Sequence, residues 1–335
     1  MSGARNDGIT LLRGLAVALV MARHALPEIF PGAGVVGVVM FFALSGHLIT
    51  GVLLDELERD GRVGLRRFAF RRALRLVPAL LVMIAVLAFV TLLFDPLDDA
   101  DELGRTVLVA LTWTADLPFP HGSAAIFHLW TLAVEEQFYL VWPVVLVLAW
   151  RRGRVAVALA AVAAVSVGAC ILSLVWAGAH PDLVYTFPTS WSVCFVIGAA
   201  SRVLRGRVRL PGIIAPLALL GLGVLSVLPI RGSAETYLLW GPLVALLTTA
   251  LVCISWQGWG TVTAPVLRPL VALGVVSYGA YLWNYPLTLW LHETAVPAGP
   301  ALAVVLTIVA ATLSWMLIEK PLARVIRRTP AAVSA

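Results

Sequence analysis

Apolar runs long enough to cross a membrane recur along the whole sequence. About ten of them approach the roughly 20 residues that a helix needs to span about 30 Å of hydrocarbon. Hydrophobic residues make up 61% of the chain and charged residues only 13%, whereas a soluble domain has about 25% charged residues. The sequence therefore predicts an all-α, polytopic membrane helix bundle with about ten transmembrane helices. The expected spans are residues 9–27, 34–54, 76–94, 136–150, 155–177, 187–204, 212–230, 237–255, 269–291 and 300–319.

The charges between these spans predict the orientation of the chain. Arginines gather in alternate loops, and the other loops are acidic or nearly neutral. Because basic residues are retained on the cytoplasmic side, ten spans with both termini cytoplasmic place every basic cluster in the cytoplasm. We expect a multi-pass protein of the bacterial plasma membrane with one membrane-embedded domain over residues 1–335. Its helical core covers 9–320, a short cytoplasmic tail covers 321–335, and the net charge of +6 gives no indication of nucleic-acid binding.

The first span contains two polar residues that hydrocarbon disfavours, Arg13 and His24. They are eleven positions apart, which is roughly three helical turns, so both side chains fall on one face about 16 Å apart along the axis. Ionisable residues inside a membrane helix usually face a polar pathway within the bundle. We expect Arg13 in the cytoplasmic half and His24 near the opposite end, where His24 is the candidate catalytic base.

Two adjacent carboxylates, Glu135 and Glu136, lie at the mouth of the fourth expected span, on the same outer side as His24. A carboxylate beside an imidazole raises its basicity and fixes its tautomer, as a general base for a hydroxyl requires. Both are therefore candidate catalytic partners of His24, although one of them could instead cap the start of the helix. His128 lies seven residues before Glu135, on nearly the same face if the helix begins that early. It is a candidate substrate contact, with a structural polar contact as the alternative.

Two segments do not resemble simple spans. The sequence of residues 65–78 predicts a basic amphipathic helix, which either lies on anionic headgroups or holds a polyanionic substrate. Its candidate ligands for a phosphorylated donor are Arg71, Arg72 and Arg75. Residues 104–120 are short and end in paired prolines, which predicts an interfacial or re-entrant piece on the outer side.

Two further motifs contain candidate binding residues. Ser45 and Gly46 suggest close helix packing and local backbone geometry, with Ser45 also a candidate substrate contact, and the role of His47 is open. Near the end, the segment SYGAYLWNYP lies too deep for an aromatic belt to explain all of it. Trp283 and Asn284 are accordingly candidates for lining an acyl-chain or sugar pocket.

The three cysteines of the chain all lie inside apolar segments. Their spacing is not that of a metal site or a disulfide framework. We interpret them as small buried apolar residues and expect no metal.

Together these stretches resemble the acyltransferase 3 family of bacterial integral-membrane acyltransferases, and the resemblance runs in order over the whole chain. Arg13 and His24 match the family's Arg-x10-His. The other matching elements are FFALSGHLI, RRFAFRRALRLVP, WTLAVEEQFYLVWP, SYGAYLWNYP and the terminal EKP.

The resemblance implies an enzyme that takes an acyl group, usually acetyl, from cytoplasmic acyl-CoA to a hydroxyl of a carbohydrate or glycosylated metabolite. No permanently bound cofactor is implied, and the partners are acyl-CoA, the acceptor and the lipid bilayer. His24 would then be catalytic, Arg13 would handle the donor or hold the site, and Glu135 and Glu136 would be candidate partners.

The sequence departs from the family pattern at three places. The acidic residue common before the Phe-Phe pair is missing around Val39 and Met40, His47 stands where Phe is usual, and Asn284 stands where His is usual. These changes affect the expected acceptor pocket and leave Arg13 and His24 in place. No hydrolase-like domain follows the last span, so transfer is expected to finish in the membrane domain or on a separate partner.

Two other classes of function compete with acyl transfer. A transporter or flippase for a lipid-linked or hydrophobic metabolite would use His24 as a proton relay, but no internal repeat supports it. An inactive scaffold predicts that His24 is dispensable.

Overall fold

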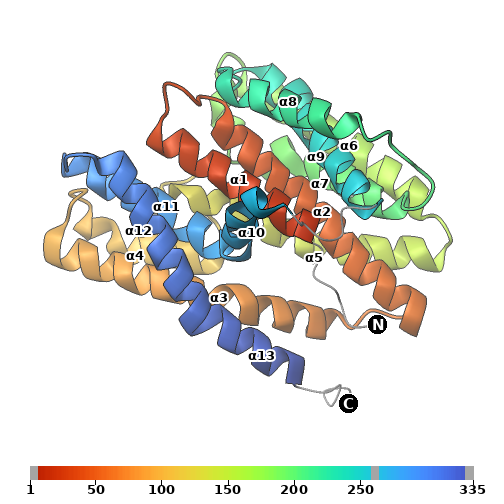
Figure 1. Ribbon diagram of the computed structural model, residues 1–335, viewed down its shortest axis with the longest axis horizontal. Helices are drawn as coiled ribbons and strands as arrows, with labels where there is room; N and C mark the ends of the chain where they lie inside the picture. Colours follow the sequence, from red (N-terminus) through yellow and green to blue (C-terminus); the bar gives the residue numbers. More distant parts are fainter. Residues whose placement is uncertain (1–6, 258–263, 329–335) are drawn as a thin grey trace. The chain divides into compact units, whose positions relative to one another are not determined.

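The chain folds entirely into helices in the computed structural model, which describes residues 7–257 and 264–328 and has no strand within them (Figure 1). It divides into two compact units. Unit 1 comprises the chain up to Val63, Trp113–Pro118 and Leu129–Val275, and unit 2 comprises Gly64–Thr112, Phe119–His128 and the chain from Val276 onward. The predicted all-α class is confirmed.

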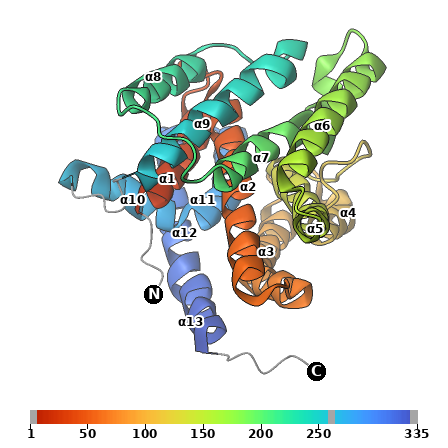
Figure 2. The ribbon, with the colours of Figure 1, turned by 90° about the vertical axis from the view of Figure 1, so that its right-hand side faces the viewer.

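Unit 1 is built around its second helix. Its helices are α1 (Asp7–Ala25), α2 (Ala33–Asp60), α5 (Trp130–Arg151), α6 (Val155–Ala177), η3 (Pro181–Val184), α7 (Pro188–Val203), α8 (Ile214–Val227), η4 (Thr236–Trp240), α9 (Gly241–Trp256), η5 (Pro265–Leu267) and α10 (Arg268–Val275). Helix α2 contacts α1, α5, α7, α8 and α9 (Figures 1 and 2). Because its sequence is apolar on all sides through most of its length, it can be buried on all sides.

Glycines bring α2 and α7 into direct backbone contact. A β-carbon added at Gly46 would collide with the carbonyl oxygen of Phe195, and one added at Gly198 would collide with that of Ala43. Small residues allow such close approach of membrane helices. The interpretation of Gly46 as a packing residue is confirmed.

Unit 2 contains the remaining helices. They are α3 (Leu65–Phe94), η1 (Ala100–Glu102), α4 (Leu103–Thr112), η2 (Ala124–Leu129, whose last residue belongs to unit 1), α11 (Ser277–Glu293), α12 (Gly299–Ser314), η6 (Trp315–Glu319) and α13 (Lys320–Arg328). Helix α11 packs along α12 and also contacts α3 (Figure 1). The Tyr278 hydroxyl donates to the Leu76 carbonyl at 2.8 Å and joins α11 to α3.

The predicted basic helix and third span form one continuous helix. Helix α3 runs for 30 residues, with Pro78 inside it. A proline removes one backbone donor, and packing against neighbouring helices compensates in long membrane helices. The predicted outer piece at 104–120 consists of α4 and an irregular stretch after it.

The ten expected spans are all helical, but fewer are long enough to cross a bilayer. Seven helices of the described residues have the length and composition of a span, and an eighth results if Pro265–Val275 and Ser277–Glu293 count together. The ninth expected span, 269–291, was predicted as continuous, and this was wrong because the helix is interrupted at Val276. The sixth and seventh correspond to α7 and α8, which have only 16 and 14 residues. The fold is therefore that of a multi-pass membrane protein.

Candidate active site

Helix α1 carries both polar residues of the first span. Arg13 lies near the middle of the helix and His24 in its last turn, and both side chains are half-buried. Because α1 is continuous from Asp7 to Ala25, the eleven-residue spacing places the two residues on one face of it. An arginine and a histidine are thereby aligned along one helix that packs against α2.

A hydrogen-bonded cluster forms around Glu135. Its Oε1 accepts a hydrogen bond from the Ser45 hydroxyl of α2 at 3.1 Å, and its Oε2 accepts one from the Tyr139 hydroxyl at 3.1 Å. Tyr139 is one helical turn after Glu135 on α5, so both side chains share a face. Two donors on two oxygens hold the carboxylate plane in one orientation. Ser45 is therefore more than a packing residue, because it joins two motifs that are 90 residues apart.

The suggestion that Glu135 or Glu136 caps the start of the helix was wrong. Helix α5 begins at Trp130 after the N-cap residue Leu129, and its first turn contains no acidic residue. The expected span began at residue 136 because charged side chains lower hydropathy. Within the folded chain these polar groups have protein partners, so the helix continues through them.

A buried aspartate is the functional candidate that sequence reasoning missed. Asp116 is fully buried, and its Oδ2 accepts a hydrogen bond from the Gln137 amide at 2.7 Å. Its backbone carbonyl accepts another from the Thr186 hydroxyl at 3.2 Å. Gln137 is two residues after Glu135, so α5 presents polar groups to two different neighbours. The only indication of this residue in the sequence was its position as a carboxylate in the expected outer piece, residues 104–120, next to an apolar run.

Aromatic rings hold α2, α5 and α7 together around this cluster. Phe42 of α2 stacks on Phe195 with centroids 4.5 Å apart and meets Trp130 edge-on at 6.0 Å. Phe138 of α5 stacks on the same Phe195 at 4.6 Å. Such pairs add about 0.5–1.5 kcal/mol each beyond burial. Because Phe138 lies between Glu135 and Tyr139 on α5, this packing also restrains the carboxylate.

An aromatic pair with a cation borders the start of α5. The Tyr185 ring meets Trp130 at 5.1 Å, and the Arg231 guanidinium lies 4.1 Å from the centroid of the Tyr185 ring. Burial raises the pKa of Tyr185, so its hydroxyl stays protonated. The contact with Arg231 is a cation–π interaction.

His128 lies before α5 and not within it. It belongs to the 3₁₀ turn η2, so the condition for sharing a helix face with Glu135 is not met. Within unit 2 its ring is buried against Tyr281 and Tyr285, with centroids 5.6 and 5.4 Å away. The Tyr281 hydroxyl donates to the His128 carbonyl at 3.0 Å.

The other candidate binding residues lie in unit 2. Asn284 is buried, and its amide donates to the Thr307 hydroxyl of α12 at 3.3 Å, while Trp283 is 8% exposed. Arg71 and Arg75 are exposed on the first half of α3, and Arg72 is half-buried there. Their spacing puts Arg71 and Arg75 on one face.

Cysteine and carboxylate positions provide no cluster for a metal ion in the described part of the chain. No group of three His, Cys, Asp or Glu side chains there is close enough to hold one. Cys170, Cys194 and Cys253 are free thiols.

Comparisons with known proteins identify relatives over almost the whole chain. The sequence model of a protein family described as an acyltransferase domain matches residues 6–319. Peptidoglycan O-acetyltransferase OatA of Listeria monocytogenes is 29% identical over 93% of this chain and 54% of that protein. O-acetyltransferase OatA of Staphylococcus aureus is 27% identical over 94% of this chain and 57% of that protein. The chain thus spans about half the length of these curated relatives, and no solved structure matches it.

Proposed function

The chain belongs to the acyltransferase 3 family, and from that premise we propose that it is a membrane O-acyltransferase that moves an acetyl group from acetyl-CoA to a carbohydrate hydroxyl. The observation that carries the proposal is the cluster around Glu135. Ser45, Glu135 and Tyr139 come from two motifs singled out in the sequence, and their side chains meet at one carboxylate. The relative from Listeria monocytogenes is named a peptidoglycan O-acetyltransferase, which favours a cell-wall carbohydrate over a glycosylated metabolite as the acceptor.

The proposed reaction needs one base and one donor channel. Arg71, Arg72 and Arg75 bind the phosphates of the donor, and Arg13 holds its pantetheine arm. His24 removes the proton from the acceptor hydroxyl, and the oxygen attacks the thioester carbonyl. The carbon–sulfur bond then breaks, and the leaving thiolate takes the proton from His24 and departs as CoA. A covalent acyl-histidine is a variant of the same chemistry.

The remaining candidates have supporting roles in this proposal. Glu135 orients and polarises His24, with Glu136 as the alternative partner. His128, Trp283 and Asn284 are the proposed contacts of the acetyl group or the acceptor.

The proposed topology has ten spans with both termini in the cytoplasm of a bacterial plasma membrane. Seven helices qualify as spans, and the pair interrupted at Val276 adds one. Counting the short apolar helix α8 and the 16-residue helix α7 as spans brings the number to ten. The positive-inside rule supports this count because it puts all basic loops on one side.

The test of the proposed function is release of CoA from acetyl-CoA by purified protein in detergent, with peptidoglycan fragments as acceptors. We expect release that depends on acceptor, together with a mass increase of the acceptor by one acetyl group. Absence of both from folded protein, across several acyl-CoAs and carbohydrate acceptors, would favour the transporter class.

The two adjacent glutamates allow a matched comparison. Glu135→Gln is expected to lower kcat at least about tenfold, because a neutral amide cannot polarise the base. Glu136→Gln removes the same charge one position away and is expected to stay within about threefold of the wild type, which is below one kcal/mol. Steady-state CoA release measures both variants. The reverse order of effects would make Glu136 the partner of His24.

A further inference from the structure

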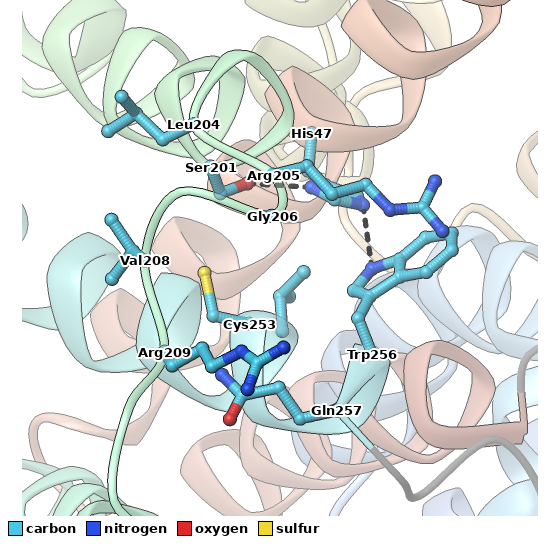
Figure 3. A pocket seen from close by; sticks show the side chains of 11 residues that line it. His47, Ser201, Leu204, Arg205, Gly206, Val208, Arg209, Cys253, Trp256 and Gln257 are labelled. Carbon is cyan, nitrogen blue, oxygen red and sulfur yellow. Dashed lines mark hydrogen bonds between the residues drawn. The ribbon is translucent and has the colours of Figure 1, made fainter.

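A cavity of about 460 Å³ lies within unit 1 (Figure 3). Its polar wall consists of His47, Ser201, Arg205, Arg209, Trp256 and Gln257, and its apolar wall includes Leu204, Val208 and Val252. Ser45 and His47 are two residues apart on α2, which separates their side chains by about 200° around the helix. Ser45 faces α5, whereas His47 faces α7 and α9. The cavity is therefore distinct from the candidate active site.

The inner end of the cavity is closed by a fixed, neutral histidine. The Ser201 hydroxyl donates its hydrogen to the Gly198 carbonyl at 2.6 Å, so in the 2.6 Å contact with His47 the imidazole Nδ1–H must be the donor. His47 Nε2 accepts a hydrogen bond from the Trp256 indole at 3.2 Å (Figure 3). Both ring nitrogens are thus committed in the neutral tautomer. His47 fixes the position of Trp256 and does not act as a base.

Trp256 in turn holds a guanidinium at the mouth of the cavity. The Arg205 guanidinium lies 3.7 Å from the centroid of the Trp256 ring. Stacking on an aromatic face leaves the N–H edges of an arginine available for bidentate binding of an anion. Because the side chain is already ordered, less conformational entropy is lost when an anion binds.

The charge at this mouth is positive. Arg209 also lines the cavity, and the described residues that line it include no carboxylate. The nearby Arg202 forms an ion pair with Asp55, whereas Arg205 and Arg209 are in no salt bridge within the described chain. Burial and the like charge of Arg202 lower the pKa of Arg205, and the nearby Asp55 carboxylate opposes this shift only in part.

We propose that this cavity binds a phosphate-bearing organic molecule, with its phosphate on Arg205 and Arg209 and its carbon skeleton against Leu204, Val208 and Val252. Paired guanidiniums are the preferred ligands of phosphate oxygens. A volume of about 460 Å³ exceeds what phosphate alone would fill and lies in the range of small-molecule sites. The same chemistry is offered by a soluble phosphate ester and by the headgroup of a phospholipid. The site does not depend on the proposed acyl transfer.

The test is binding of two probes to the chain of residues 1–335. In the first arm, glycerol 3-phosphate is titrated into the protein in detergent and binding is measured by calorimetry. In the second arm, the protein is released from nanodiscs and its retention of phosphatidylglycerol is measured by native mass spectrometry. Phosphatidylcholine is the reference lipid. Arg205→Gln and Arg209→Gln are each expected to weaken whichever probe binds by about tenfold, the loss of one charge-assisted contact. Arg207→Gln is the matched control, because Arg207 lies in the same turn but does not line the cavity.

The two probes distinguish the sources of the ligand. Saturable binding of glycerol 3-phosphate that both variants weaken supports a soluble ligand, and selective retention of phosphatidylglycerol alone supports a lipid headgroup. The proposal is overturned if neither probe binds the wild type, or if Arg207→Gln weakens binding as much as the other two variants. Each variant is first checked for wild-type elution in gel filtration.

Discussion

Replacing His24 with alanine is expected to abolish acetyl transfer while leaving the fold intact. A positioned general base contributes about 10²–10⁴-fold to the rate, so acceptor-dependent CoA release by His24→Ala should fall by about that factor. The side chain is half-buried in the last turn of α1. Its removal leaves no large cavity, so thermal unfolding should change little compared with the loss in rate.

The control for this prediction is His292→Ala. The His292 side chain is 82% exposed at the end of α11, so it should keep wild-type activity. Arg13→Ala is expected to raise KM for acetyl-CoA, because it removes a donor contact and not the base. Wild-type turnover by His24→Ala would refute the catalytic assignment and leave a scaffold or transporter.

The second large effect is a loss of thermal stability, which we expect when Gly46 or Gly198 in unit 1 is replaced with alanine. In Gly198→Ala or Gly46→Ala the new methyl group would collide with a backbone carbonyl of the neighbouring helix. A carbonyl oxygen in a helix cannot rotate away, so α2 and α7 must separate. Overpacking lowers the free energy of unfolding by about 1–3 kcal/mol and sometimes more. We expect the upper end of this range for both variants. The measurement is the midpoint of thermal unfolding in detergent, which should fall.

Gly168→Ala is the matched control for these glycines. Gly168 is also inside a helix, α6, but a β-carbon there would meet no atom within 4 Å. Alanine is a better helix former than glycine by about 0.5–1 kcal/mol, so this variant should be as stable as the wild type or more so. Equal destabilisation by all three variants would show that the contact between α2 and α7 is not the cause.

The helix contact and the active site are coupled in this structure. Gly46 directly follows Ser45, whose hydroxyl donates to Glu135. Movement of α2 away from α7 would therefore displace Ser45 from the carboxylate. We expect Gly46→Ala to lose activity even below its unfolding temperature.

Several properties of this protein follow from local patterns in the sequence alone. Long apolar runs predict helices because backbone groups in hydrocarbon must be satisfied within the segment. The expected spans are helical in the structure apart from the break at Val276. The helical spacing of Arg13 and His24 follows from the constant geometry of one continuous helix. The packing role of Gly46 was predictable because a glycine inside a membrane span usually serves to let a neighbouring helix approach closely.

Other features depend on contacts between distant segments. Glu135 accepts a hydrogen bond from Ser45, 90 positions away, and Asp116 accepts one from Gln137, 21 positions away. No local pattern specifies such pairs. Hydropathy placed the start of the fourth span at residue 136, yet hydrogen bonds with α2 and the outer segment let α5 begin at Trp130. The cavity beside His47 likewise requires α2, α7 and α9 together. The periodicity of a sequence shows which face of a helix is apolar, but it does not show which other helix will contact that face. Polar clusters and cavities form only where particular faces of several helices meet, so they depend on the tertiary structure.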